Sequence, residues 1–326
     1  MKKAFVTGST GFLGLNLIEE LARRDWEIHA LHLPNEDLSY LSRFPVQTVS
    51  GDILDVDSLP RVMPGNVDAV FHLAGDTSTW SKNNQRQRRI NVDGTVNALN
   101  AAIKQKAGRF IYTSSISAFG FHDGPMSEAT VSTAMQSGVN YHMTKYMAEQ
   151  EIKKHAHEIR TVILNPCNVI GPYDQKNWAQ TIKTVYQNRL PGYPPGLGTF
   201  AHVRDVVCAH IQAAEIDNPQ GQYVIGGTPA RFEEIFNTIE TILGREHSGK
   251  VISKTKLWTA MNLFKIKSWL DGKEPLITQE KYKRLIGTQL CDDRAAIRDL
   301  GLKRSSLQQM FTDSYEWLLQ ENLLNQ

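Results

Sequence analysis

Three glycines at fixed spacing near the N-terminus constrain the fold of this chain more than any other feature. A compact apolar run, Lys3–Thr7, leads directly into the segment Gly8-Ser9-Thr10-Gly11-Phe12-Leu13-Gly14, and a helical pattern of apolar residues follows. In a strand–turn–helix unit the first glycine permits a tight turn, the second lets the backbone approach a pyrophosphate, and the third lets the helix pack closely on the strand. The start of such a helix also offers unpaired N–H groups to an anion. The loop therefore predicts a strand–helix–strand unit that binds a dinucleotide.

Short apolar runs alternate with helix-length segments through the first half of the chain. After 3–7 the runs cover residues 28–33, 46–49, 67–73, 110–113 and 161–164, and helical stretches such as 85–105 and 139–155 lie between them. Buried parallel strands read as continuous apolar runs, because both faces of the sheet are covered. The alternation therefore predicts an α/β fold with a doubly wound parallel sheet of the Rossmann type over residues 1–168.

The pattern changes after residue 165. Proline and glycine cluster at 171–172 and 190–196, a helix-like stretch covers 203–215, a strand-like run covers 223–225, and the chain beyond 228 reads as mostly helical. We expect residues 201–227 to return to the nucleotide-binding sheet. Residues 169–200 and 228–326 would then form a smaller, mostly helical substrate domain.

Composition excludes several other classes of protein. The 326 residues include 36 basic and 34 acidic side chains, and a net charge of +2 argues against nucleic-acid binding. Three scattered cysteines without CxxC spacing form neither a disulfide framework nor a zinc knuckle, and the ten histidines show no metal-ligand spacing. No apolar run approaches the length of a membrane span. We expect a cytoplasmic protein with no metal, no nucleic-acid partner and no stable membrane insertion.

A tyrosine and a lysine, Tyr141 and Lys145, lie four residues apart on one face of an expected helix. A phenol with a pKa of about 10 is a poor acid at neutral pH, whereas a neighbouring ammonium would lower that pKa and could also bond a nicotinamide ribose. Thr113, Ser114 and Ser115 follow a strand at the sheet edge where ligands of open α/β sheets bind. The pattern predicts that a serine holds a substrate oxygen while the tyrosine exchanges its proton. The alternative is a surface pair beside a serine-rich turn.

Several further motifs make the chain resemble the extended short-chain dehydrogenases/reductases. They are Gly51-Asp52, Phe71-His72-Leu73-Ala74-Gly75, Asn91-Val92-Asp93-Gly94-Thr95, Thr113-Ser114-Ser115 and Asn165-Pro166. The resemblance implies that Ser115, Tyr141 and Lys145 form a catalytic triad, and that the chain is a homodimer formed through helices around 85–105 and 139–155. It implies a cofactor site made of Gly8, Thr10, Gly11, Phe12, Leu13, Gly14, Leu33, Asp52, Ile53, Leu73, Ala74, Gly75, Thr113, Tyr141, Lys145, Pro166 and Asn168.

The end of the second expected strand bears on the choice between NAD and NADP. An acidic residue there bonds the ribose 2′-OH of NAD, whereas an arginine nearby accommodates the 2′-phosphate of NADP. The segment His32-Leu33-Pro34-Asn35 contains neither; Glu36 and Asp37 lie slightly late, and Arg43 later still. The missing acid leaves room for a phosphate and favours NADP, with NAD as the alternative.

Two branches of the resembled family compete. Sugar-nucleotide epimerases usually carry an arginine four residues before the histidine of a His-Val segment, and here that place is Gly198, although Arg204 or Arg231 could substitute. Reductases similar to dihydroflavonol reductase fit the segments 165–172 and 190–193 better. A pocket for a hydrophobic substrate would include Asp76, Trp80, Phe119, Phe121, Trp178 and Tyr193, although about half of such aromatics would belong to the core instead.

These patterns together predict NADP(H)-dependent reduction of an aldehyde or ketone of a small hydrophobic substrate. The alternatives are a nucleotide-sugar epimerase or dehydratase, and a cofactor-binding regulatory protein without chemistry. Residues 251–270 mix tryptophans and aliphatic residues with four lysines, as a membrane-surface helix does. Their apolar positions fall all round a helical wheel, which favours an element of the substrate domain or a lid.

Overall fold

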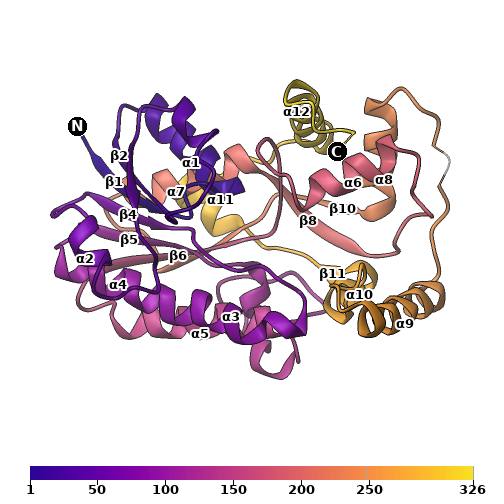
Figure 1. Cartoon of the computed structure of the whole chain (residues 1–326), viewed down its shortest axis with the longest axis horizontal. Coiled ribbons are helices and arrows are strands. Elements are labelled where there is room, and N and C mark those ends of the chain that lie inside the picture. The colour runs from indigo at the N-terminus through magenta and orange to yellow at the C-terminus, as the bar shows by residue number, and fades with distance from the viewer. Residues whose placement is uncertain (248, 326) are drawn as a thin grey trace.

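The computed structural model describes residues 1–247 and 249–325, and a seven-stranded parallel sheet organises it (Figure 1). The strand order is β3-β2-β1-β4-β5-β6-β9, which confirms the predicted doubly wound α/β fold. The strands are β1 (Lys3–Thr7), β2 (Glu27–His32), β3 (Gln47–Ser50), β4 (Ala69–His72), β5 (Arg109–Thr113), β6 (Arg160–Pro166) and β9 (Gln222–Ile225). The order reverses between β1 and β4, and ligands of such sheets bind outside the carboxyl ends of the strands at the point of reversal.

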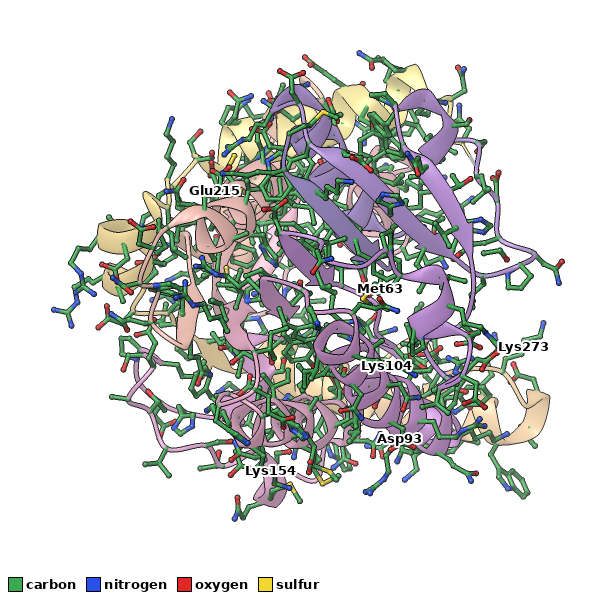
Figure 2. The ribbon with its side chains drawn as sticks, turned by 90° about the vertical axis from the view of Figure 1, so that its left-hand side faces the viewer. Met63, Asp93, Lys104, Lys154, Glu215 and Lys273 are labelled. Atoms are coloured by element: carbon green, nitrogen blue, oxygen red, sulfur yellow. The ribbon has the colours of Figure 1, made fainter. Side chains whose placement is uncertain are left out.

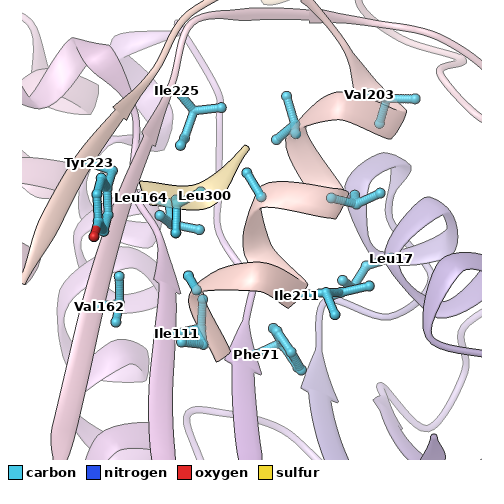
Figure 3. Packing of buried hydrophobic residues seen from close by; sticks show 14 of the residues in the cluster. Leu17, Phe71, Ile111, Val162, Leu164, Val203, Ile211, Tyr223, Ile225 and Leu300 are labelled. Atoms are coloured by element: carbon cyan, nitrogen blue, oxygen red, sulfur yellow. The ribbon is translucent and has the colours of Figure 1, made fainter. Parts of the chain in front are cut away.

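Helices cover both faces of this sheet (Figure 1). One face carries α1 (Phe12–Arg23), α7 (Val203–Glu215) and α11 (Arg294–Leu300), and the other carries α2 (Leu59–Val62), α4 (Gly94–Lys104) and α5 (Asn140–Lys154). Leu17 of α1 and Ile211 of α7 pack with Phe71 of β4 in one hydrophobic cluster (Figure 3). Leu99 of α4 and Ile152 of α5 pack in a second cluster on the opposite face.

A smaller sheet lies beside the first. It contains β7 (Asn168–Ile170), β8 (Leu197–His202), β10 (Thr228–Arg231) and β11 (Thr288–Gln289), and only the pairing of β8 with β10 is antiparallel. The helices α6 (Trp178–Tyr186), α8 (Phe232–Ile242) and α12 (Leu307–Gln320) pack around it. The sequence pattern did not predict this sheet, because its strands are short and two of them contain Gly198 or Pro229, which are unfavourable within strands.

Two further helices, α9 (Lys254–Asp271) and α10 (Gln279–Ile286), form a pair at the outer edge of this second part (Figure 1). The short helix α3 (Asn84–Arg88) precedes a π-helical turn, Arg89–Asp93, that leads directly into α4. A π-helical turn inside a helix is rare and often marks a functional site. The division of the chain into two domains at the residues expected above stays a prediction.

Candidate active site

The glycine loop between β1 and α1 leaves no room for side chains. Gly8 has φ +67°, in the left-handed region, and a Cβ on it would lie 2.6 Å from the Ala74 nitrogen. A Cβ on Gly14 would lie 2.1 Å from the Gly8 carbonyl oxygen. No side chain caps the start of α1, where Gly11 is exposed, so the first N–H groups of this helix are available to an anion. The loop therefore fits the pyrophosphate of a dinucleotide, with Thr10, Phe12 and Leu13 alongside.

Asn91 holds the loop after β4 against α5. Its side-chain amide donates to the carbonyl of Asp76 (3.0 Å) and to the hydroxyl of Thr144 (3.1 Å), and its Oδ1 accepts from the Asp76 amide (2.7 Å). This residue lies within the π-helical turn before α4 and is buried. As a result Gly75 lies next to Lys145, since a Cβ on Gly75 would be 3.5 Å from the lysine Nζ.

Ser115 and Tyr141 are brought together by the end of β5 and the start of α5. The Ser115 Oγ accepts from the Ser117 amide (3.1 Å), which caps the short turn that follows β5. The Ser115 side chain lies close enough to the Tyr141 phenol to influence its pKa. Loss of contact with water raises the pKa of the Tyr141 phenol, although Ser115 and the nearby Arg284 oppose this shift. Tyr141 is therefore protonated at neutral pH and can act as an acid.

Lys145 is buried one helical turn after Tyr141. Its ammonium donates to the carbonyl oxygen of Thr113 (2.9 Å) and to the hydroxyl of Tyr112 (3.3 Å). Burial lowers its pKa to about 8, and the Glu149 carboxylate opposes that change. The expectation that Lys145 lowers the pKa of Tyr141 is wrong in this structure, because desolvation of the phenol dominates and the ammonium bonds Thr113 and Tyr112.

Glu149 is a buried carboxylate that the sequence patterns did not single out. It accepts from the Ser114 hydroxyl and from the Asn165 side-chain amide (2.6 Å), and the same amide donates to the Ser115 carbonyl (2.9 Å). Burial raises the pKa of Glu149. The contacts join β5, β6 and α5 directly behind the Ser115–Tyr141 pair. A carboxylate four residues after Lys145 was the one available signal, since that spacing places both on one helical face.

The residues near the end of β2 that bear on the choice between NAD and NADP make contacts within the protein. The Leu33 amide donates to the Glu36 carboxylate (3.0 Å), which brings that acid beside the strand end. Arg43 instead forms two hydrogen bonds to Glu321, of 2.6 and 3.0 Å, and lies over the ring of Tyr40. The arginine considered for a 2′-phosphate is thus already paired.

The other expected cofactor residues lie at the carboxyl edge of the sheet or just beyond it. Asp52 accepts from the Leu54 amide (2.9 Å), and buried Ile53 packs where a Cβ on Gly94 would otherwise lie. Leu73 and Ala74 follow β4, Thr113 ends β5 and Pro166 ends β6. Asn168, in β7, donates to the Thr199 carbonyl (3.0 Å) and so links the edge to the smaller sheet.

A cleft of about 460 Å³ opens beside the start of α5. Its walls come from the loop after β4, from residues 138–140, and from α9, α10 and the segment between them. The aromatic and apolar lining residues are Trp80, Val139, Met261, Trp269, Pro275 and Ile277. On the α10 side Glu280 is buried and pairs with Arg284 (3.1 Å), and the charges of both influence the pKa of Tyr141. The sequence patterns gave no signal for this α10 pair.

The residues expected in a substrate pocket separate into two groups. Trp80 lines the cleft. Asp76 lies two residues before the first lining residue, Ser78, and pairs with Arg86 (2.9 Å). Phe121 packs on His142 with ring centroids 4.8 Å apart. Asp76 and Phe121 do not line the cleft, and the remaining three residues pack within hydrophobic clusters. These are Phe119 in the core of the main sheet, Trp178 against Phe200 and Phe232, and Tyr193 against Phe236 with its hydroxyl donating to Glu240 (2.7 Å).

The glycine loop, the parallel sheet and the Ser115–Tyr141–Lys145 arrangement at its edge define an extended short-chain dehydrogenase/reductase. Residues 4–226 match the NAD dependent epimerase/dehydratase family, and the chain belongs to this family. It is 29% identical to "Putative dihydroflavonol 4-reductase" of Synechocystis sp., over 96% of this chain and 93% of that protein. It is 25% identical to sterol demethylase protein B of Methylococcus capsulatus, over 98% and 99% of the two chains. The crystal structure of gox2253 has a TM-score of 0.84 and 26% identity, with 99% of each chain covered.

Proposed function

We propose that this protein reduces an aldehyde or ketone carbonyl of a small hydrophobic substrate with NADP(H). The observation that carries the proposal is the proximity of Ser115 to the Tyr141 phenol, which stays protonated, beside a cleft with apolar and aromatic walls. A volume of about 460 Å³ lies within the usual range for small-molecule sites. Relatives named for dihydroflavonol reduction and sterol demethylation support a hydrophobic substrate.

Three side chains divide the work in the proposed reaction. Ser115 orients the carbonyl oxygen, and Tyr141 donates its phenolic proton to that oxygen as negative charge develops there. Lys145, which donates to the carbonyl of Thr113, would hold the ribose of the dinucleotide. The bound nicotinamide supplies the hydride chemistry. The loop of Gly8, Thr10, Gly11, Phe12, Leu13 and Gly14 would hold its pyrophosphate.

The preference for NADP rests on the absence of an acid within the last residues of β2. Two contacts favour NAD instead: Glu36 lies beside Leu33, and Arg43 is already paired with Glu321. Comparison of kcat/KM for NADPH and NADH measures the preference directly. A higher value with NADH would overturn this part of the proposal and leave the carbonyl chemistry intact.

The reaction is tested with a panel of hydrophobic aldehydes and ketones, followed by NADPH absorbance. We expect turnover that falls by about 10²-fold or more in Tyr141→Phe, because the general acid is lost. Tyr146→Phe, on the next turn of α5, serves as the matched control. Full activity of Tyr141→Phe would refute the assignment. Turnover of UDP-sugars but of no simple carbonyl would establish the epimerase alternative, and tight dinucleotide binding without any turnover would indicate a regulatory protein.

A further inference from the structure

Helix α9 packs weakly against the rest of the molecule. Only Leu257 of its 18 residues is buried. Five of the fourteen exposed large hydrophobic side chains of the described chain belong to this one helix, a concentration that scattered surface residues do not explain. They are Trp258, Leu263, Ile266, Trp269 and Leu270, and three of them are 63–82% exposed.

These exposed side chains share one side of the helix. At about 100° per residue they fall within an arc of roughly 140°, together with Thr255, Thr259 and Asn262, and no residue in that arc is charged. A different arc holds Leu257, Met261 and Phe264, which are buried or half-buried. The apolar positions fall all round the wheel because one arc packs on the protein and another faces solvent. We call the solvent-facing arc, Trp258, Leu263, Ile266, Trp269 and Leu270, the outer face of α9.

Lysines border both edges of the outer face. Lys254 and Lys265 lie along one edge, and Lys256 and Lys267 along the other. No ion pair involves these four ammonium groups within residues 1–247 and 249–325. Lys273, just after α9, is also exposed and lies at the edge of the molecule in Figure 2. The border is positively charged and its charges are available to a partner.

We propose that the outer face of α9 docks this protein peripherally on an anionic lipid surface. Tryptophans and aliphatic side chains enter the headgroup region of a bilayer, while flanking lysines reach the phosphates. Each lysine near an anionic leaflet strengthens binding several-fold. No helix in the described part of the chain is long and apolar enough to cross a membrane, so the contact is confined to one leaflet.

A second copy of the chain is a poorer occupant for the same face. In a two-fold contact the same patch meets itself. Four lysines border the outer face and Asp271 is the one carboxylate of α9, so a pairing of two such faces brings together mostly like charges. Like charges held in contact oppose the association.

Docking through α9 also orients the cleft. Met261, Asn262, Lys265, Ser268 and Trp269 line it, so the cleft opens next to the outer face. Trp269 contributes to both. A hydrophobic substrate dissolved in the bilayer would then reach the cleft without crossing water; this last step rests on the proposed function, whereas the docking itself does not.

Vesicle flotation of the full chain tests the docking. We expect the protein to float with vesicles of phosphatidylcholine mixed with phosphatidylglycerol, and more weakly with phosphatidylcholine alone. Leu263→Glu/Leu270→Glu should lower binding on the order of tenfold or more, because two charges enter the apolar arc. Lys256→Gln/Lys267→Gln should lose binding to the anionic vesicles only, by about fivefold per lysine.

The control variant Val131→Glu/Leu319→Glu makes the same charge change at two exposed apolar positions far from α9 in the sequence, and should float as the wild type does. Unchanged melting temperatures establish that the exposed substitutions leave the fold intact. Failure of the wild type to float with anionic vesicles, or equal flotation of Leu263→Glu/Leu270→Glu, overturns the proposal. So does a wild-type dimer in solution that this variant converts to a monomer, which would assign the outer face to a second copy. None of these readouts depends on turnover of a carbonyl.

Discussion

Replacing Lys145 with methionine should make this protein more stable at neutral pH while removing its activity. The wild-type ammonium is buried, and burial lowers its pKa from 10.5 to about 8. The unfolded chain therefore binds a proton more tightly than the folded one, so wild-type stability rises with pH between about 8 and 10.5. Below pH 8 the folded protein carries the full cost of a desolvated charge. Methionine fills similar volume without that charge.

The size of the effect follows from the pKa difference. About 2.5 pKa units correspond to roughly 3 kcal/mol of destabilisation in the wild type at pH 7. At pH 10 the buried amine is already neutral in the folded protein, and roughly 1 kcal/mol remains. The variant also loses the hydrogen bonds to Thr113 and Tyr112, but the part of this loss that does not depend on charge is the same at both pH values, and the charge-dependent part is already contained in the pKa. The stability difference between variant and wild type should therefore change by about 2 kcal/mol between pH 7 and pH 10.

Urea unfolding of both proteins at pH 7 and pH 10 gives the four free energies of unfolding that are needed. Lys153→Met, at an exposed position of the same helix, is the matched control and should show no pH-dependent difference. A Lys145→Met difference that stays constant between the two pH values would refute the reasoning, because the ammonium would then be as well stabilised inside the protein as in water. Activity with the best carbonyl of the panel should fall in Lys145→Met and not in Lys153→Met.

Three further substitutions probe other parts of the structure. Gly14→Ala places a methyl group against the Gly8 carbonyl, so NADPH binding followed by fluorescence should weaken at least tenfold; unchanged affinity would contradict the role of the loop. Glu36→Gln removes a carboxylate beside Leu33 and should raise the NADPH-to-NADH ratio of kcat/KM by about fivefold, whereas an unchanged ratio would place Glu36 away from the ribose. Asp293→Asn weakens the pairing of the buried Asp293 carboxylate with the half-exposed Arg304 and should lower the free energy of unfolding by about 1–3 kcal/mol, measured against Asp292→Asn at a less buried position.

Local patterns in the sequence were sufficient to predict the main parallel sheet and the glycine loop. The spacing of Gly8, Gly11 and Gly14 has a steric cause that is visible in the structure, because a Cβ on Gly8 or Gly14 would meet backbone atoms. Buried parallel strands contain continuous apolar runs, so β1 and β4–β6 could be found without knowledge of their neighbours.

Other features of the site depend on tertiary contacts, which the sequence patterns do not report. Trp178 and Tyr193 are aromatic, as pocket residues often are, but hydrophobicity alone does not distinguish a cleft wall from a core. Glu149 and Glu280 are ordinary helical carboxylates until folding buries them beside Ser114 and Arg284. The direction of the Tyr141 pKa shift likewise depends on how much water the fold removes, which residue spacing does not report.

The position of α7 in the sequence has a consequence for synthesis of the chain. This helix covers one face of the main sheet, where Val203 and Ile211 pack with Ile111 and Val162, yet it begins 37 residues after β6 ends. When synthesis has reached the end of β6, most strands of the main sheet exist, but part of one apolar face is not yet covered by a helix. Such a nascent chain exposes apolar surface to chaperones or to other chains until residues 203–215 emerge. Fragments that end near residue 168 should share this exposure and aggregate.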